Sequence, residues 1–212
     1  MKNLTEVTEV TALIPAGKGR SEVWLDGGFG FVLYRAELSR LDIHSGCTID
    51  NDTLERIYTD VLNPRALNRL LYLLGSRDMT EKELDEKLKK GKYPERVREY
   101  AISKLKEYGY VDDESYAIRY AECYHSRKSM GQIRQELLKR GISREQIARA
   151  FTGIEEAYPD DDSERQLIKS ILLKRHYDAA SADRKEKQKQ YAYLCRKGFK
   201  SEDISAAMFD LT

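Results

Sequence analysis

Residues 139–147 read Lys-Arg-Gly-Ile-Ser-Arg-Glu-Gln-Ile, and this stretch decides the fold because the chain contains its pattern three times. Residues 89–97 and 196–204 also run as two basic residues, Gly, three variable residues, Glu, one variable residue and a β-branched aliphatic residue. Gly readily takes the left-handed conformation after a helix, cations suit the carboxyl end of the helix dipole, and Glu suits the next amino end. Each copy therefore predicts a joint between two helices; in chain order we call them joints 1, 2 and 3.

The spacing of the joints predicts a helical repeat. They start about 50 and then about 57 residues apart, close to the periods of known helical repeat arrays. Capping boxes at Thr80, Ser129 and Ser143, each with Glu or Gln three residues on, predict further helix starts. We expect a mainly α-helical chain of three tandem three-helix repeats in an elongated array, preceded by a small antiparallel β module. The expected bounds are 1–62 for the β module with a connecting helix, then 63–111, 112–157 and 158–212 for the repeats.

The first 60 residues differ from the rest of the chain. β-branched and aromatic residues between 7 and 38, interrupted by Gly-containing turns at 15–19 and 26–28, predict a three-stranded meander whose last strand runs from Phe29 to Leu38. The Gly-Lys-Gly turn at 17–19 lacks the spacing of a phosphate-binding loop. A helix capped by Asn51 or Asp52 should follow, and Asn63-Pro64 should restart the chain as a second helix.

The third repeat should be longer than the second. It follows an acidic stretch at 158–162 that reads as a linker, and its extra residues should lie in the middle helix or in the loop before it.

Charge is distributed unevenly. The formal net charge is +1, but residues 165–200 hold eleven Lys or Arg against three acids. There is no apolar run long enough for a membrane span, and three widely spaced cysteines fit a reducing compartment. We expect a cytoplasmic monomer with no membrane association.

Candidate catalytic or metal-binding groups are poorly arranged. Cys123 and His125 would point to nearly opposite sides of a helix, and Asp112 and Asp113 stand where a helix cap is needed. Tyr116, Tyr120 and Tyr124 share one helix face, as either core residues or a platform for stacking bases. We expect no catalysis, no cofactor and no metal.

Basic side chains are the remaining signal. Any one of them fits a solvated helix face, but their accumulation on the last two repeats favours a polyanion or an acidic protein surface as the partner. They are Arg127, Lys128, Arg134, Lys139, Arg140, Lys174, Arg175, Arg184, Lys185, Lys187, Lys189, Arg196 and Lys197.

The joints, together with residues 77–84, 109–117 and 126–131, resemble the RecX family of bacterial regulators of the recombinase RecA. The likeness spans about residues 64–210, and the Gly-Tyr-Val-Asp-Asp run at 109–113 is its most specific part. The strands before it are similar to an extension that some members carry.

The resemblance implies a function that spacing does not show. Members of the family are expected to bind in the groove of the RecA–DNA filament, to block its extension and to lower its ATPase, recombinase and co-protease activities. DNA itself, single- or double-stranded, would be bound weakly and without specificity. The motif carries over Asp113 and Tyr116 as the first positions of the second repeat, and Arg127, Arg134, Lys139 and Arg140 as its basic face.

Two other interpretations remain open at this point. The trihelical repeats would suit a protein that reads duplex DNA directly, although their third helices offer no recurring set of side chains for base edges. An enzyme would require a convergent set of groups that the sequence does not display.

Overall fold

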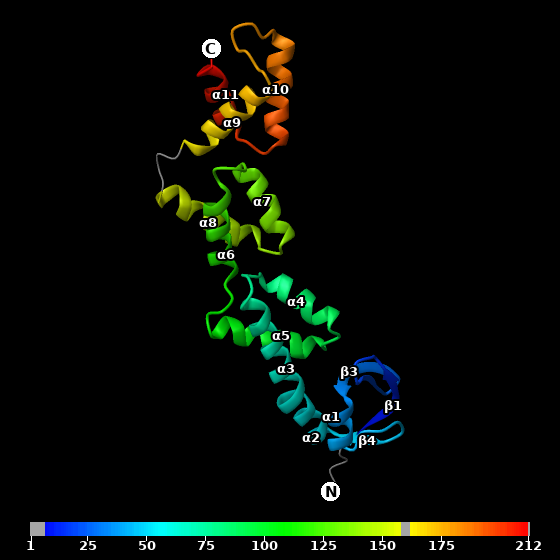
Figure 1. Cartoon of the computed structure of the whole chain (residues 1–212). Coiled ribbons are helices and arrows are strands. Elements are labelled where there is room, and N and C mark those ends of the chain that lie inside the picture. The colour runs from blue at the N-terminus through cyan, green and yellow to red at the C-terminus, as the bar shows by residue number, and fades with distance from the viewer. Residues whose placement is uncertain (1–6, 158–161, 212) are drawn as a thin grey trace. The chain divides into compact units, whose positions relative to one another are not determined.

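The computed structural model describes residues 7–157 and 162–211 and divides the chain into two compact units, Met1–Val111 and Asp112–Thr212 (Figure 1). The acidic linker predicted at 158–162 lies outside the described residues, apart from Asp162. Most of the described chain is helical, and an antiparallel sheet stands at the start of the first unit. The prediction of a mainly α-helical chain with an amino-terminal β module is confirmed.

The sheet is antiparallel throughout, with the strand order β3-β2-β1-β4. Val10, Val23, Phe31 and Leu33 are fully buried on its inner face. β-branched and aromatic side chains suit such a half-buried, pleated surface. The strands are β1 (Val7–Pro15), β2 (Arg20–Leu25), β3 (Gly28–Tyr34) and β4 (Thr48–Asp50).

Two details of the predicted meander are wrong. The strand expected from Phe29 to Leu38 ends at Tyr34, and the chain continues as the short helix α1 (Arg35–Arg40). The sheet also has a fourth strand, β4, which pairs with β1. Because β4 has only three residues, no alternation of apolar and polar positions marks it in the sequence.

The connecting helix starts one residue earlier than predicted. Its N-cap is Asp50, whose side chain accepts a hydrogen bond from the Thr53 N–H at 2.7 Å. Asn51 and Asp52, the two predicted caps, are already inside the helix. The signal was ambiguous because three neighbouring residues have side chains suited to capping.

The next α-helix begins at Asn63 with Pro64 in its first turn, as predicted, but the chain is already helical before it, so the predicted break at Asn63-Pro64 is wrong. α2 (Asn51–Arg56), the π-helical turn η1 (Ile57–Leu62) and α3 (Asn63–Leu74) follow one another without a break. Proline inside a helix lacks an N–H donor, and its ring clashes with the carbonyl four residues earlier. The wider π turn immediately before Pro64 makes room for the ring.

One hydrophobic core joins the sheet to the first three-helix repeat. Phe31 of the sheet, Ile57 of η1, Leu84 of α4 and Leu105 of α5 all belong to it and are fully buried. The two remaining helices of this unit are α4 (Glu81–Lys90) and α5 (Glu95–Glu107). The sheet is thus packed on the first repeat and shares its core.

The second unit contains two repeats, each with its own core. α6 (Asp113–Tyr124), α7 (Met130–Lys139) and α8 (Arg144–Ala157) form the first of these, and α9 (Ser163–Lys174), α10 (Arg184–Arg196) and α11 (Ser201–Phe209) form the second. α10 has 13 residues against 10 in α7, and the loop before it is also longer. The predicted extra length of the third repeat is confirmed.

Joints 2 and 3 end their first helix with the same pair of backbone hydrogen bonds. In joint 2 the Ile142 N–H donates to the Leu137 carbonyl at 3.2 Å and the Gly141 N–H donates to the Leu138 carbonyl at 3.0 Å. Gly141 has a φ of 92°, which favours glycine. The equivalent donors in joint 3 are Phe199 and Gly198. This Schellman motif satisfies the last carbonyls of the helix and directs Ile142 and Phe199 into the core.

Joint 1 uses the same motif one residue later. Gly91 has a φ of −78°, and Lys92 takes the left-handed conformation with a φ of 59°. The prediction of a left-handed Gly91 is therefore wrong. In every joint the left-handed residue stands two positions before the N-cap of the next helix. In joint 1 that N-cap is Pro94, which stands one residue later relative to the Gly than the N-caps of the other joints do. The left-handed conformation is therefore also one residue later, at Lys92.

In the second unit, joint 3 lies against the start of α7. The Ser129 hydroxyl donates to the Lys197 carbonyl at 2.5 Å and accepts from the Gln132 N–H at 3.1 Å. A Cβ placed on Gly131 would lie 2.3 Å from the carbonyl oxygen of Gly198. Because the obstacle is backbone, only glycine fits at residue 131 without moving the joint.

Replacing Gly131 by Ala should push joint 3 away from α7 and reduce the free energy of unfolding by about 1–3 kcal/mol, as overpacking of a tight contact does. Gly153 in α8 is the matched control, since a Cβ there meets nothing within 4 Å. Gly153→Ala should stabilise by about 0.5–1 kcal/mol through helix propensity. Urea unfolding of both variants measures the difference; equal stabilisation by the two would show that the glycine contact does not form.

Candidate partner-binding surface

A strip of three tyrosines runs along α6. Tyr116 and Tyr120 are stacked with ring centroids 6.0 Å apart, and Tyr120 and Tyr124 are tilted at 4.6 Å. All three are half-buried against the core of the second repeat. Their inner sides therefore serve the core, and their outer sides contribute to the surface.

Two of the predicted basic residues lie on this strip. The Lys128 ammonium stands 4.3 Å from the ring centre of Tyr124, and the Arg140 guanidinium stands 5.1 Å from that of Tyr120. Cations over aromatic faces are attracted by the negative face of the ring. The structure thus brings Lys128, Arg140 and Tyr116 together, although they are distant in sequence.

Glu136 of α7 holds the centre of this group. It accepts hydrogen bonds from the Lys128 ammonium, at 2.6 Å, and from the Tyr120 hydroxyl. We call Tyr116, Tyr120, Tyr124, Lys128, Glu136 and Arg140 the repeat-2 cluster. Glu136 was not among the predicted site residues; its only sequence signal is the spacing of four from Arg140, which allows an ion pair along a helix.

The electrostatics of the repeat-2 cluster do not suit proton transfer. Hydrogen bonding to Glu136 raises the pKa of Lys128, and hydrogen bonds from Lys128 and Tyr120 lower the pKa of Glu136. Burial, and then the bond to Glu136, raise the pKa of Tyr120. A general acid or base works best with a pKa near neutrality. All three pKa values shift away from neutral pH. Lys128 and Glu136 therefore carry fixed charges, and the Tyr120 hydroxyl keeps its proton.

The third repeat has a related group built from different helices. The Arg175 guanidinium lies 4.0 Å from the ring centre of Tyr193, and the Lys197 ammonium lies 5.9 Å from it. Arg175 also donates to the Gln190 side chain at 2.7 Å. We call Arg175, Gln190, Tyr193 and Lys197 the repeat-3 cluster. Both clusters contain the second basic residue of their joint, Arg140 or Lys197.

The other predicted residues are not members of these two clusters. Asp113 is 5% exposed and offers little surface to a partner. Arg134 lies 5.3 Å from the ring centre of Phe151, on the α8 side of the repeat. Exposed positions are occupied by Arg127, Lys139, Lys174 and Arg196.

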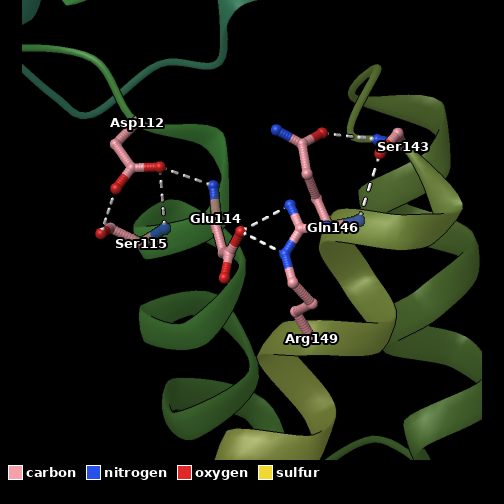
Figure 2. A network of polar contacts seen from close by, with 6 residues as sticks. All are labelled: Asp112, Glu114, Ser115, Ser143, Gln146 and Arg149. Carbon is pink, nitrogen blue, oxygen red and sulfur yellow. Dashed lines mark hydrogen bonds and ion pairs between the residues drawn. The ribbon is translucent and has the colours of Figure 1, made fainter.

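A polar network fixes the start of α6 (Figure 2). The Asp112 carboxylate accepts from the Glu114 N–H at 2.9 Å and from the Ser115 hydroxyl at 2.6 Å, which confirms that Asp112 caps the helix. Arg149 of α8 donates to the Glu114 carboxylate at 2.8 Å. This clamp between α6 and α8 was missed because its partners stand 35 residues apart.

Figure 2 also shows the predicted capping box at the start of α8. The Ser143 N–H donates to the Gln146 side chain at 3.0 Å, and the Gln146 N–H donates to the Ser143 hydroxyl at 3.2 Å. Thr80 and Ser129 form the other two predicted boxes. Local signals of this kind were read correctly because each involves residues three positions apart.

Searches for a metal centre or a membrane span give no candidate. The described residues contain no group of three or more His, Cys, Asp or Glu that could hold a metal ion. Within the same ranges, no helix combines the length and the apolar character needed to cross a bilayer.

Comparison with known proteins gives the family. Models of the first, second and third three-helix domains of RecX match residues 66–113, 112–150 and 162–208. The regulatory protein RecX of Caldanaerobacter subterraneus subsp. tengcongensis is 32% identical over 201 residues, which cover 94% of this chain and 98% of that protein. The chain belongs to the RecX family. Members of this family are regulatory proteins rather than enzymes.

Further RecX proteins agree with this assignment. The regulatory protein RecX of Bacillus subtilis is 28% identical over 194 residues, covering 89% of this chain and 71% of that protein. A crystal structure of a regulatory protein RecX superposes with a TM-score of 0.62 and 27% identity, over 93% of this chain and 97% of the other. The predicted family resemblance and the three three-helix repeats are confirmed.

Asp112→Ala should destabilise the second unit by about 1 kcal/mol through loss of the helix cap, as urea unfolding at neutral pH would measure. Hydrogen bonding to Ser115 lowers the pKa of Asp112 below its ordinary value of 3.8. A carboxyl with a lowered folded-state pKa stabilises the fold above its unfolded pKa and loses this contribution as pH falls. The penalty of Asp112→Ala should therefore shrink below about pH 3.8.

Asp162 provides a matched control because it stands at the N-cap of α9, where its side chain accepts no capping hydrogen bond. Asp162→Ala should cost less than Asp112→Ala at neutral pH. Equal costs at the two positions, or a penalty at Asp112 that does not depend on pH, would contradict the role given to Asp112.

Proposed function

We propose that this chain regulates the RecA recombinase by binding along the RecA–DNA filament in the cytoplasm. Binding in the filament groove blocks extension of the filament and lowers its ATPase, recombinase and co-protease activities. No catalytic step is involved. The observation that carries the proposal is membership of the RecX family through all three of its three-helix domains.

The two clusters support a surface for a large, repeating partner. Each presents cations on the outer side of tyrosines, and each is anchored to a joint by Arg140 or Lys197. The exposed Arg127 and Arg196 stand next to Lys128 and Lys197 in the sequence and add further positive charge at the surface. Two similar surfaces in successive repeats suit a partner whose own subunits repeat.

The direct test is RecA-dependent ATP hydrolysis on single-stranded DNA, with RecA from the same organism and the chain added in increasing amounts. Inhibition should appear at less than one chain per RecA subunit, because blocking extension at one point affects many subunits. A cognate, active RecA whose hydrolysis is unaffected would refute the proposal. Tight, site-selective duplex binding without RecA would instead favour the direct DNA-reading alternative.

Reversing charge at exposed positions should weaken inhibition without unfolding the repeat. In Arg127→Glu/Lys139→Glu, both side chains are exposed, and the repeat-2 cluster keeps its internal contacts. We expect the concentration for half-maximal inhibition of RecA ATPase to rise at least about tenfold, since charge reversal replaces attraction by repulsion across an interface.

Arg40→Glu/Arg56→Glu is the control, with the same change of charge at two exposed positions in the first unit. It should leave inhibition within about twofold of the unmodified chain, because rim charges distant from a contact act only through screened fields. If both double variants inhibit alike, the second repeat does not provide the contact surface.

A further inference from the structure

A strongly cationic cavity of about 350 Å³ lies in the first unit, where the sheet meets the first repeat. β2, β3, α3, α4 and joint 1 all contribute to its wall. Its lining contains no Asp or Glu among the described residues. The cations that line it are Arg20, Arg65, Arg69, Lys87, Lys90 and Lys92.

Only two of these six charges are compensated. Arg65 pairs with Glu37, and Lys92 pairs with Glu22. No carboxylate within the described part of the chain forms an ion pair with Arg20, Arg69, Lys87 or Lys90. The cavity therefore holds about four excess positive charges, a concentration of one sign that favours a bound anion.

Part of this lining is held in place before any ligand arrives. Arg65 donates to the Val32 carbonyl at 3.1 Å, and its guanidinium lies 4.9 Å from the ring centre of Tyr34. Tyr93 is more than half-buried; burial raises the pKa of Tyr93, while Arg65, Arg69 and Arg20 act against that rise. Its hydroxyl is thus a neutral donor among guanidinium groups, a combination suited to phosphate oxygens.

An aromatic cleft of about 370 Å³ adjoins this cavity and shares Lys92 and Tyr93 with it. Trp24 and Phe29 line the cleft in an edge-to-face pair, with ring centroids 6.3 Å apart. Phe29 is 41% exposed, although it is large and apolar. The one carboxylate in the cleft, Glu22, is neutralised by Lys92.

We propose that the cationic cavity and the aromatic cleft together bind single-stranded nucleic acid, with backbone phosphates in the cavity and a base against Phe29 and Trp24. A duplex hides its base faces, whereas a single strand offers phosphates and unstacked bases side by side. An acidic peptide would match the cations but would leave the aromatic faces unused. The site uses joint 1, which the clusters of the second unit do not involve.

Two readouts test the site in the full-length chain without RecA, so the result is independent of the proposed regulation. Fluorescence anisotropy of a labelled oligothymidylate measures binding. The chain has a single tryptophan, Trp24, so tryptophan emission excited selectively over that of the 14 tyrosines reports the aromatic cleft. Oligothymidylate should bind and quench Trp24, whereas an abasic oligonucleotide of equal length should bind more weakly and leave its emission unchanged.

Variants separate the two halves of the site. Arg69→Glu/Lys90→Glu should weaken oligothymidylate binding at least about tenfold and reduce the slope of log affinity against log salt by about 1.4, at about 0.7 per phosphate contact. Phe29→Ala should weaken binding about tenfold, the scale of one lost stacking contact, and leave the salt slope unchanged. Arg40→Glu/Arg56→Glu, with the same charge change elsewhere in this unit, should bind as the unmodified chain does.

Each contrary outcome overturns the proposal. Equal binding and equal quenching by the abasic oligonucleotide would mean that bases are not recognised. Displacement by polyglutamate or inorganic phosphate at charge concentrations equal to that of the oligonucleotide would indicate a general anion site. Unchanged binding by Arg69→Glu/Lys90→Glu would place any nucleic-acid contact elsewhere. Lys90→Gln, a milder change, and the Trp24 signal of the unmodified chain keep the test decisive if the double variant misfolds.

Discussion

The fold depends on how each repeat turns the chain between its last two helices. The last carbonyls of a helix have no hydrogen-bond partner within the helix, and they are a large share of the carbonyls of a short helix. In joint 2 the hydrogen bond from the Ile142 N–H to the Leu137 carbonyl closes the end and buries Ile142 in the same step. Joints 1 and 3 repeat this bond at Tyr93 and Phe199. In each joint the same backbone turn therefore ends a helix and places an apolar or aromatic side chain against the core.

The sequence was a reliable guide wherever structure is local. Helix caps at Asp112 and Ser143 and the left-handed Gly141 follow from residues within a few positions of one another. Features set by distant partners were not predictable: the pairing of β4 with β1, the contact of Gly131 with Gly198, and the clamp between Glu114 and Arg149. The π turn before Pro64 was only partly predictable. Pro64, a local signal, shows that the helix is disturbed there. Whether the helix then breaks or forms a π turn depends on packing around the buried Ile57 and Leu62.

The candidate surface was foreseen as a list of cations, but its organisation was not. Lys128 and Arg140 lie over tyrosines, and Glu136 fixes their position, so part of the predicted basic face has a structural role. The cavity beside joint 1 was missed because its cations come from three separate elements and form no run in the sequence: Arg20 from β2, Arg65 and Arg69 from α3, and Lys87 from α4. Joints thus place cations in both units, at Lys90, Arg140 and Lys197.

The central claim is that repeats 2 and 3 contact the RecA filament. A photo-cross-linking amino acid placed singly at Arg127, at Arg196 and at Lys18 of the β1–β2 turn, all exposed positions, tests it most directly. With filaments assembled on DNA, the chains modified at residues 127 and 196 should form covalent adducts with RecA, and the chain modified at residue 18 should form few. Adducts confined to residue 18 would contradict the account, because the contact would then belong to the sheet.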